Sequence, residues 1–267
     1  MQSYIDISAQ PIDPLDDFRL FDPTMEREAT QRLIDRLLPR AAYGRCLLSP
    51  PPYYLLARGA QDMRAVNDFV LRQWARCGAV AGCFGVSEPK YGEKGIAELD
   101  RIAGLGMKGV LWSPRAQGMF GDDPLLAELC RHAHKRGLRS MVRAASFSTN
   151  EALWRTWRLA SQCPDIPIIV TGALRNWDNA RMIAHERGGP GNVHYDTAGW
   201  TVSTDLARMV SLLGERLMFG TGGTETGDAG ADRVTTSMRR ADVSEAMIEA
   251  VLGGNAVRLF GLDGETA

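Results

Sequence analysis

MKGVLWS, at residues 107–113, is followed by DPLLAELCRHAHKRG at residues 123–137 and by RSMVRAA at residues 139–145. The first and third segments are short and rich in apolar residues, as buried strands are. The second has the period of about 3.6 residues that is typical of a helix. Two strands joined by a helix of this length form a βαβ unit, in which the strands run parallel. This stretch therefore predicts an α/β fold.

The same alternation continues toward both ends of the chain. Six more apolar segments lie at residues 3–8, 44–49, 79–86, 166–172, 192–197 and 216–221. Segments with helical period lie at residues 25–40, 60–78, 94–106, 148–162, 176–189, 203–214 and 244–261. Eight such units in 267 residues fit a closed (β/α)8 barrel better than an open sheet. We therefore expect a single TIM-barrel domain over residues 1–267.

Capping residues support these boundaries. Pro124 stands at an expected first helical position, and Gly137 follows an expected helix end. Ser148–Thr149 precedes Glu151 in the pattern of a capped helix start. These signals place helix starts near residues 124 and 148.

Two irregular segments follow expected strands. SPPPYY, at residues 49–54, forms either a stiff turn or a lid that faces a substrate. GTGGTETGDAGAD, at residues 220–232, is rich in glycine but lacks the lysine of a phosphate-binding loop. We expect the second segment to be a mobile loop.

The composition indicates the class of protein. Hydrophobic residues make up 45% of the chain and charged residues 24%, which suits a globular protein with a sizeable core. The 31 basic and 32 acidic residues nearly cancel, so neither nucleic acid nor an anionic membrane is an expected partner. No apolar run is long enough to span a membrane, and no secretory signal is visible. Five widely spaced cysteines without a CxxC pair favour a cytoplasmic location.

Six motifs on the expected elements resemble one protein family. They are GIAELDRIAGLGMKGVLWSP (95–114), DDPLLAELCRHAHKRGLRSMV (122–142), CPDIPIIVTGA (163–173), GNVHYDTAG (191–199), ERLMFGTGG (215–223) and GGNAVRLFGL (253–262). In this order they are similar to the fourth to eighth strands and the closing helix of amidohydrolase family 2. The resemblance covers nearly the whole chain and is strongest from Asn67 onward. It implies a TIM barrel of the metal-dependent hydrolase and decarboxylase group.

The resemblance also implies five functional positions. In such enzymes a His-x-His or Glu-x-His pair ending strand one, a His ending strand five and an Asp ending strand eight hold the metal. A His ending strand six commonly does acid–base work. In this sequence the positions fall, in chain order, on Ser8 and Gln10, Arg143, Thr171 or Gly172, and Gly222.

None of these residues supplies the imidazole, thiolate or carboxylate donors that zinc-type sites use. The guanidinium of Arg143 would repel a divalent cation. We therefore predict that the metal site has been lost, and we expect no metal and no other cofactor.

The remaining histidines do not rebuild the site. His132 and His134 lie two residues apart in an expected helix, so they point to different sides. His185 lies near a helix end and is interpreted as structural. His194 and Asp196 alternate on strand seven and therefore face the same side of it. We prefer to interpret His194 as a hydrogen-bonded core residue.

Active sites of barrels are built from residues at the carboxyl ends of the strands. Here these residues are Ser8, Gln10, Ser49, Glu88, Trp112, Arg143, Arg175, Asp196 and Thr221. A buried Arg143 needs a partner, since an unpaired charge costs several kcal/mol. Glu88 and Asp196 are the candidates, and we hypothesise a pair with Asp196. The pair either plugs a dead site, which we prefer, or leaves Arg143 to bind a substrate carboxylate.

Trp154 and Trp157 share one face of the helix expected at residues 148–162. Such a stripe is either core packed against the barrel or, on an outer helix, a subunit interface. The sequence leaves both interpretations open.

Two functions of different classes follow. The first is a degenerate family member without a metal, either a non-catalytic partner subunit of an active relative or a metal-independent binder of small carboxylates. It would form a homo-oligomer or a hetero-oligomer, with ligand contacts from Ser8, Gln10, Trp112, Arg143, Arg175 and Thr221. The second is an active hydrolase or decarboxylase of a small carboxylate or amide. Its catalytic residues would be Arg143, Asp196, Glu88 and His194.

Overall fold

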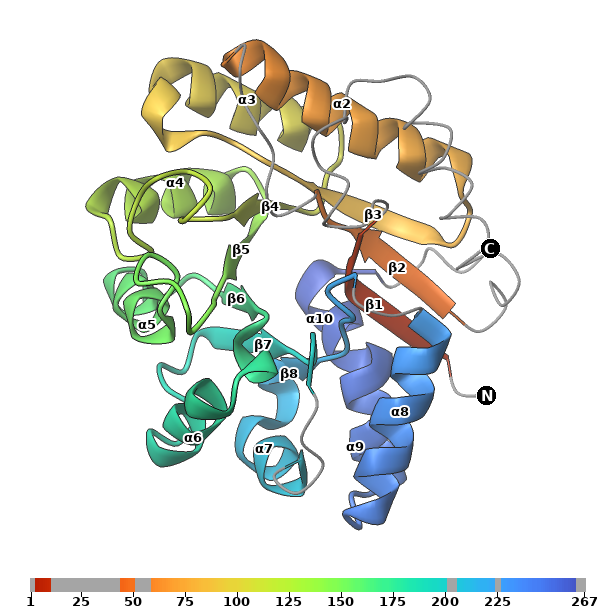
Figure 1. Cartoon of the computed structure of the whole chain (residues 1–267). Coiled ribbons are helices and arrows are strands. Elements are labelled where there is room, and N and C mark those ends of the chain that lie inside the picture. Colours follow the sequence, from red (N-terminus) through yellow and green to blue (C-terminus); the bar gives the residue numbers. More distant parts are fainter. Residues whose placement is uncertain (1–2, 11–43, 51–58, 201–205, 224–226, 263–267) are drawn as a thin grey trace.

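The structure is a computed structural model that describes residues 3–10, 44–50, 59–200, 206–223 and 227–262. Its described strands run parallel and pair in sequence order, and helices surround them (Figure 1). The strands are β1 (Tyr4–Ala9), β2 (Gly44–Leu48), β3 (Val80–Gly85), β4 (Gly109–Trp112), β5 (Arg139–Arg143), β6 (Ile168–Thr171), β7 (Val193–Asp196) and β8 (Leu217–Met218). Each expected apolar segment contains one strand, so the predicted TIM barrel is confirmed.

The described helices are α2 (Ala60–Arg76), α3 (Glu93–Gly104), α4 (Pro124–Lys135), α5 (Leu153–Gln162), α6 (Trp177–His185), α7 (Leu206–Leu213), α8 (Gly227–Arg240), α9 (Glu245–Glu249) and α10 (Asn255–Phe260). Short 3-10 helices lie at η3 (Pro89–Tyr91), η4 (Ala173–Arg175) and η5 (Gly214–Arg216). A π-helical segment, Ala250–Gly254, interrupts the helix expected at residues 244–261. The helix expected at residues 25–40 and residues 51–54 of SPPPYY lie outside the described residues.

Apolar side chains fill the barrel. The inner core comprises Ile5, Ile7, Leu47, Ala81, Phe84, Leu111, Met141, Ile169 and Met218, with Ala256, Phe260 and Leu262 from the last helix and its end. The rings of Phe84 and Phe260 meet edge to face at 5.7 Å. Arg139, the first residue of β5, donates to the carbonyl of Leu259 at 3.0 Å. The last helix therefore closes the amino-terminal end of the barrel, and a site belongs at the opposite end.

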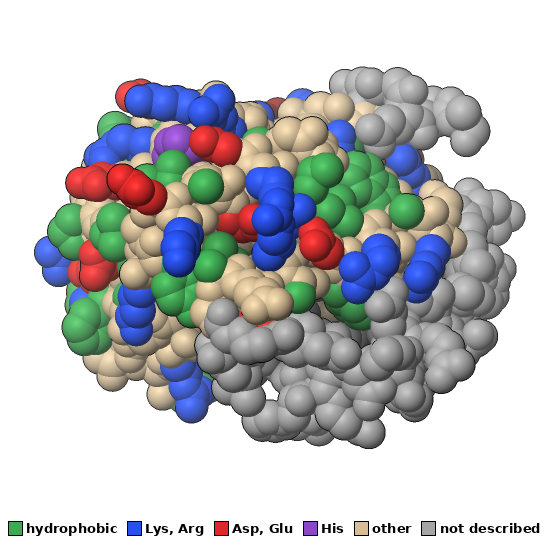
Figure 2. Space-filling model, turned by 90° about the horizontal axis from the view of Figure 1, so that it is seen from above, with side chains coloured by type: hydrophobic (Ala, Val, Ile, Leu, Met, Phe, Trp, Pro, Cys, Tyr) green, Lys and Arg blue, Asp and Glu red, His purple; other side chains and the backbone are tan. Residues whose placement is uncertain are grey.

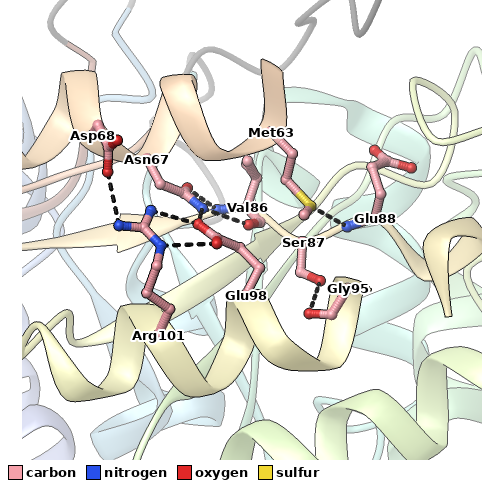
Figure 3. Close-up of polar contacts among 9 residues, drawn as sticks. All are labelled: Met63, Asn67, Asp68, Val86, Ser87, Glu88, Gly95, Glu98 and Arg101. Carbon is pink, nitrogen blue, oxygen red and sulfur yellow. Dashed lines mark hydrogen bonds and ion pairs between the residues drawn. The ribbon is translucent and has the colours of Figure 1, made fainter. Parts of the chain in front are cut away.

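The carboxyl end of β3 is fastened to α2 and α3 (Figure 3). The side chain of Asn67 accepts the amide of Val86 at 2.7 Å and donates to its carbonyl at 2.9 Å. It also donates to Glu98 at 2.7 Å, and Glu98 pairs with Arg101. Because Asn67 is fully buried, this network sets the position of the segment that leaves β3 and carries Glu88.

β1 carries one extra residue relative to β2. The register between the two strands shifts between Asp6 and Ala9. Such a bulge re-aims the side chains beside it. Ile7 lies in the inner core and the next residue, Ser8, lines the cavity at the barrel mouth. Strict alternation would have turned Ser8 to the outer face of the strand.

The expected boundaries of α4 are confirmed. Asp123 caps the helix, since its side chain accepts the amide of Leu125 at 2.9 Å, and Pro124 is the first helical residue. Gly137 follows the helix end with a φ of 80°.

The helix start expected at residues 148–151 is wrong, since α5 begins at Leu153. The amide of Glu151 donates to the carbonyl of Ser148 at 3.2 Å, and the carbonyl of Glu151 accepts the amide of Ala145 at 2.9 Å. These bonds form a turn, and the side chain of Glu151 is fully buried instead of capping a helix.

The loop expected at residues 220–232 is only partly correct. The α8 helix begins at Gly227, so the second half of this glycine-rich segment is helical. Residues 224–226 lie outside the described part of the chain.

The two tryptophans of α5 have different surroundings. Trp157 packs against the core, and its indole N–H donates to the hydroxyl of Tyr195 at 2.8 Å. Trp154 is 42% exposed, and the guanidinium of Arg155 lies 4.3 Å from the centre of its ring. The core interpretation therefore applies to Trp157. An interface at Trp154 stays a prediction.

Charges of both signs are interspersed over the face that Figure 2 shows. This distribution agrees with the formal net charge of −1. Among the helices of the described residues, none has both the length and the apolar character needed to cross a membrane.

Candidate functional site

A cavity of about 140 Å³ lies at the carboxyl ends of the strands. Its apolar lining includes Leu111, Met141 and Phe147. Its polar lining includes Ser8, Gln10, Ser49, Arg143, Thr171 and Arg175. Four of the six expected ligand contacts therefore share one cavity, namely Ser8, Gln10, Arg143 and Arg175. Trp112 and Thr221 do not line it.

Arg143 ends β5 beside the cavity, and its side chain is 18% exposed. Its Nε lies 3.7 Å from Oε2 of Glu151, a carboxylate that also accepts the backbone N–H of Arg115 at 3.3 Å. Burial raises the pKa of Glu151, although Arg143 acts in the opposite direction. The structure thus pairs Arg143 with Glu151 in place of the expected Asp196. The turn at residues 148–151 brings this acid inward.

Asp196 ends β7 and is fully buried behind the cavity wall. Its Oδ1 accepts the amides of Gly172 at 3.1 Å and Ala198 at 3.2 Å, and its Oδ2 accepts the hydroxyl of Thr171 at 2.7 Å. The hydroxyl of Ser8 donates to the same carboxylate. Burial raises the pKa of Asp196, and these hydrogen bonds act against that rise. Asp196 therefore joins the ends of β1, β6 and β7.

Asp6 in β1 is a buried acid that the sequence analysis did not single out. Its carboxylate accepts the hydroxyl of Thr221 at 2.6 Å and the amides of Thr221 and Ser8 at 3.0 Å each. Burial raises the pKa of Asp6 to about 6, and Asp196 adds to the rise. The bond to Asp6 also explains why Thr221 does not line the cavity. An acid inside an apolar strand was the signal that could have identified it, because a buried charge needs partners.

The raised pKa of Asp6 makes stability depend on pH. The carboxyl titrates near 3.8 when unperturbed and near 6 in the folded protein, so the folded state holds the proton more tightly. This contribution to stability is complete below about pH 4 and is lost as the pH rises through about 6. We expect the free energy of unfolding of the wild type to fall across this range relative to that of Asp6→Asn. Urea denaturation at a series of pH values measures it, and parallel profiles would contradict it.

Two of the expected catalytic residues lie away from the cavity. Glu88 is buried beyond β3, and its amide donates to Sδ of Met63 at 3.2 Å (Figure 3). His194 is in register with Ile169 of the inner core, one layer below Asp196. Burial lowers the pKa of His194 to about 4, and Arg216 adds to the fall. The imidazole is therefore neutral at physiological pH, inside the barrel.

Trp112 lies in the core between the barrel and the surrounding helices. It is fully buried, and its indole N–H donates to the hydroxyl of Ser140 at 3.2 Å. This position gives Trp112 a packing role that its place at a strand end did not reveal.

The histidines of α4 have a structural role. Nε2 of His132 lies 2.7 Å from Oδ1 of Asp100 on α3, which joins the two helices. His134 lies two residues further along α4, and neither histidine lines the cavity. His185 at the end of α6 is largely exposed.

The strand ends do not fit a zinc-type metal ion. The hydroxyl oxygen of Ser8 accepts the amide of Gly222 at 3.0 Å, which joins the ends of β1 and β8. Arg143 and Arg175 line the same cavity, and their positive charges would repel a divalent cation. A Cβ at Gly222 would lie 3.6 Å from a guanidinium nitrogen of Arg175. Among the described residues, no three His, Cys, Asp or Glu side chains gather in a way that could hold a metal.

Comparison with known proteins shows a family match and a shared fold. A family model described as amidohydrolase matches residues 56–262. The structure of 2,6-dihydroxybenzoate decarboxylase complexed with 2,6-dihydroxybenzoate is 17% identical, with 99% of this chain and 100% of that chain covered and a TM-score of 0.71. The apo IDCase of Metarhizium anisopliae is 14% identical, with 99% and 98% covered and a TM-score of 0.71.

A putative 2-pyrone-4,6-dicarboxylic acid hydrolase from Pseudomonas putida is 16% identical, with 98% of this chain and 99% of that chain covered and a TM-score of 0.62. At these identities the likeness to solved structures shows the fold alone. A search of curated proteins found no match.

Proposed function

The chain belongs to the amidohydrolase family, and from this premise we propose that its mouth cavity binds small carboxylates without a metal ion. The observation that carries the proposal is the presence of two arginines, Arg143 and Arg175, in the lining of one cavity of about 140 Å³. Arginine binds a carboxylate through two parallel hydrogen bonds, which supply both affinity and orientation. A small anion is the ligand that best complements this lining.

The contact between Arg143 and Glu151 is compatible with a ligand. Its distance of 3.7 Å exceeds the roughly 2.7–2.9 Å of a charge-assisted hydrogen bond. The raised pKa of Glu151 indicates that Arg143 offsets the burial of this carboxyl only in part. A ligand carboxylate in the cavity can therefore approach Arg143 more closely than Glu151 does.

Other lining atoms suit a small organic acid. The hydroxyl oxygen of Ser49 and Oε1 of Gln10 have no hydrogen-bond partner among the described residues. Buried polar atoms are normally hydrogen-bonded, so both are available to a ligand. Leu111, Met141 and Phe147 supply apolar surface for its carbon skeleton.

A metal-free member of the family has two roles open to it. It acts as a carboxylate binder in its own right, or it serves as a non-catalytic partner subunit of an active relative. The cavity lining supports the first role. The second requires an association that only solution measurements of mass and composition can test.

A second function, hydrolysis or decarboxylation of a small carboxylate or amide, has one observation in its favour. Asp196 has a raised pKa and contacts the hydroxyls of Ser8 and Thr171, which line the cavity. Acids with shifted pKa values beside a cavity are typical of catalytic sites. A decarboxylase and a putative hydrolase share the fold.

Calorimetric titration of the purified protein with acetate, propanoate and benzoate tests the carboxylate site. We expect Arg143→Gln to weaken binding about 10- to 100-fold, because it removes charge-assisted hydrogen bonds to the ligand. Arg136→Gln is the matched control, since it removes an exposed guanidinium at the end of α4 and should leave affinity unchanged.

Elemental mass spectrometry of the same sample decides whether a metal takes part. Binding that depends on a tightly held metal ion would overturn the proposal, as would wild-type affinity in Arg143→Gln. Release of carbon dioxide or of a hydrolysis product from a bound substrate would establish the second function.

A further inference from the structure

Two hydroxyl groups separate the cavity from the buried carboxylate of Asp196. Ser8 reaches this wall from β1 and Thr171 from β6, and both line the cavity. Both hydroxyls also contact Asp196, which is fully buried. A ligand in the cavity therefore meets the hydroxyls, while Asp196 acts on it only through them.

Both hydroxyls donate their hydrogen bonds to the carboxylate of Asp196. Its Oδ1 accepts two backbone amides, from Gly172 and Ala198, which can only donate. Its Oδ2 accepts the hydroxyl of Thr171 at 2.7 Å, and the hydroxyl of Ser8 donates to the same carboxylate. A hydroxyl has one proton to give. Once that proton points at Asp196, Ser8 and Thr171 can offer the cavity only lone pairs.

The backbone keeps this arrangement in place. The oxygen of Ser8 accepts the amide of Gly222 at 3.0 Å, so its proton is turned away from that bond. Gly220 allows the close approach, because a Cβ there would lie 2.4 Å from the oxygen of Ser8 and 3.0 Å from Oδ2 of Asp196. Ser8 and Thr171 thus present a wall of hydrogen-bond acceptors.

The arginines supply hydrogen-bond donors to the same cavity. Arg143 and Arg175 carry only donors, and they line the same cavity. The cavity therefore combines a donor side for an anionic group with an acceptor side backed by Asp196. A plain carboxylate complements only the first of these sides.

We propose that the cavity selects carboxylates that carry a hydrogen-bond donor of their own, a hydroxyl or an N–H group, which donates to Ser8 or Thr171 while the carboxylate contacts the arginines. This inference rests on the proposed carboxylate site and specifies its ligand class. Asp196 is a positioning residue in this scheme, because it orients the hydroxyls without touching the ligand.

Matched ligands that differ in a single group test the selectivity. Lactate and 2-fluoropropanoate have similar shapes, and fluorine in place of the hydroxyl cannot donate a hydrogen bond. Calorimetric titration at neutral pH should show lactate binding about tenfold more tightly, which is the effect of one hydrogen bond at a buried acceptor. Mandelate and 2-fluoro-2-phenylacetate provide a second pair with a larger carbon skeleton.

In the variant Asp196→Asn, we expect the hydroxyls of Ser8 and Thr171 to change from hydrogen-bond acceptors to donors toward the cavity. The amides of Gly172 and Ala198 hold the side-chain oxygen at the Oδ1 position, so the new NH2 group takes the Oδ2 position and donates to the hydroxyls. Their protons then turn to the cavity. We expect the preference for lactate over 2-fluoropropanoate to disappear while both still bind. A merely structural role of Asp196 would lower both affinities equally.

Ser8→Ala combined with Thr171→Val provides the test if Asp196→Asn does not fold, and it should also abolish the preference. Equal affinity of the wild type for both members of each pair would overturn the inference and leave the carboxylate site standing. Failure of every carboxylate to bind would overturn the proposed function, and the inference with it.

Discussion

Replacing Trp112 with alanine is expected to lower the free energy of unfolding by about 3–5 kcal/mol. The indole is fully buried between β4 and the outer helices, so its removal leaves a cavity that the close-packed surroundings fill only in part. The change also removes the indole N–H that the hydroxyl of Ser140 accepts at 3.2 Å. Urea denaturation followed by circular dichroism measures the loss.

Phe147→Ala is the matched control for this prediction. Phe147 is 68% exposed and lines the cavity, so its truncation should change the free energy of unfolding by no more than about 0.5 kcal/mol. The variant Trp112→Phe separates packing from ligand contact, because it keeps an aromatic ring in the core. It should bind carboxylates as the wild type does. Weaker carboxylate binding by a stable Trp112→Phe variant would support the ligand contact that the sequence predicted for Trp112.

Asn67→Ala is expected to lower the free energy of unfolding by about 3 kcal/mol. The change leaves the amide and carbonyl of Val86 without their side-chain partner, and it removes one donor to Glu98 (Figure 3). All these groups are buried, and each buried polar group without a partner costs about 1–3 kcal/mol. Denaturation in urea again provides the measurement.

The neighbouring residue supplies the control. Asp68→Ala removes a partner of Arg101 on the same helix, but Asp68 is 41% exposed. An exposed ion pair contributes less than about 1 kcal/mol, so this variant should remain near wild-type stability. Asn67→Asp preserves the shape and removes the donor to Val86 and Glu98, so we expect a loss similar to that of Asn67→Ala. Equal stability of the Asn67 and Asp68 variants would contradict the prediction.

The strands could be predicted because their signals are local. Short apolar segments alternate with helical periods, and each of the eight expected strands is present. Both boundaries of α4 were equally predictable, since Pro124 at its start and Gly137 after its end act within one turn of their own positions. The helix start predicted from Ser148 and Glu151 was wrong because of tertiary contacts. Glu151 is drawn inward beside Arg143 and the amide of Arg115, so no helix starts there.

The side of a strand on which a side chain lies could be predicted only where the strand is regular. His194 and Asp196 alternate on β7 and both point into the barrel. Ser8 is different, because the bulge in β1 turns it to the cavity. Trp112 stands at the end of a strand, yet it faces the helices. The bulge in β1 and the orientation of Trp112 toward the helices could not be predicted from the order of residues alone.

The sequence by itself determined the order of strands and helices, the family, and the residue types at the strand ends. It did so because hydrophobic period and residue identity are properties of the local chain. The tertiary structure alone decided which groups meet: Glu151 with Arg143, Asp6 with Thr221, and Asp196 with two hydroxyls of the cavity wall. These contacts join segments far apart in sequence, and their energies depend on burial and on distances of a few ångströms, which only the packed barrel sets.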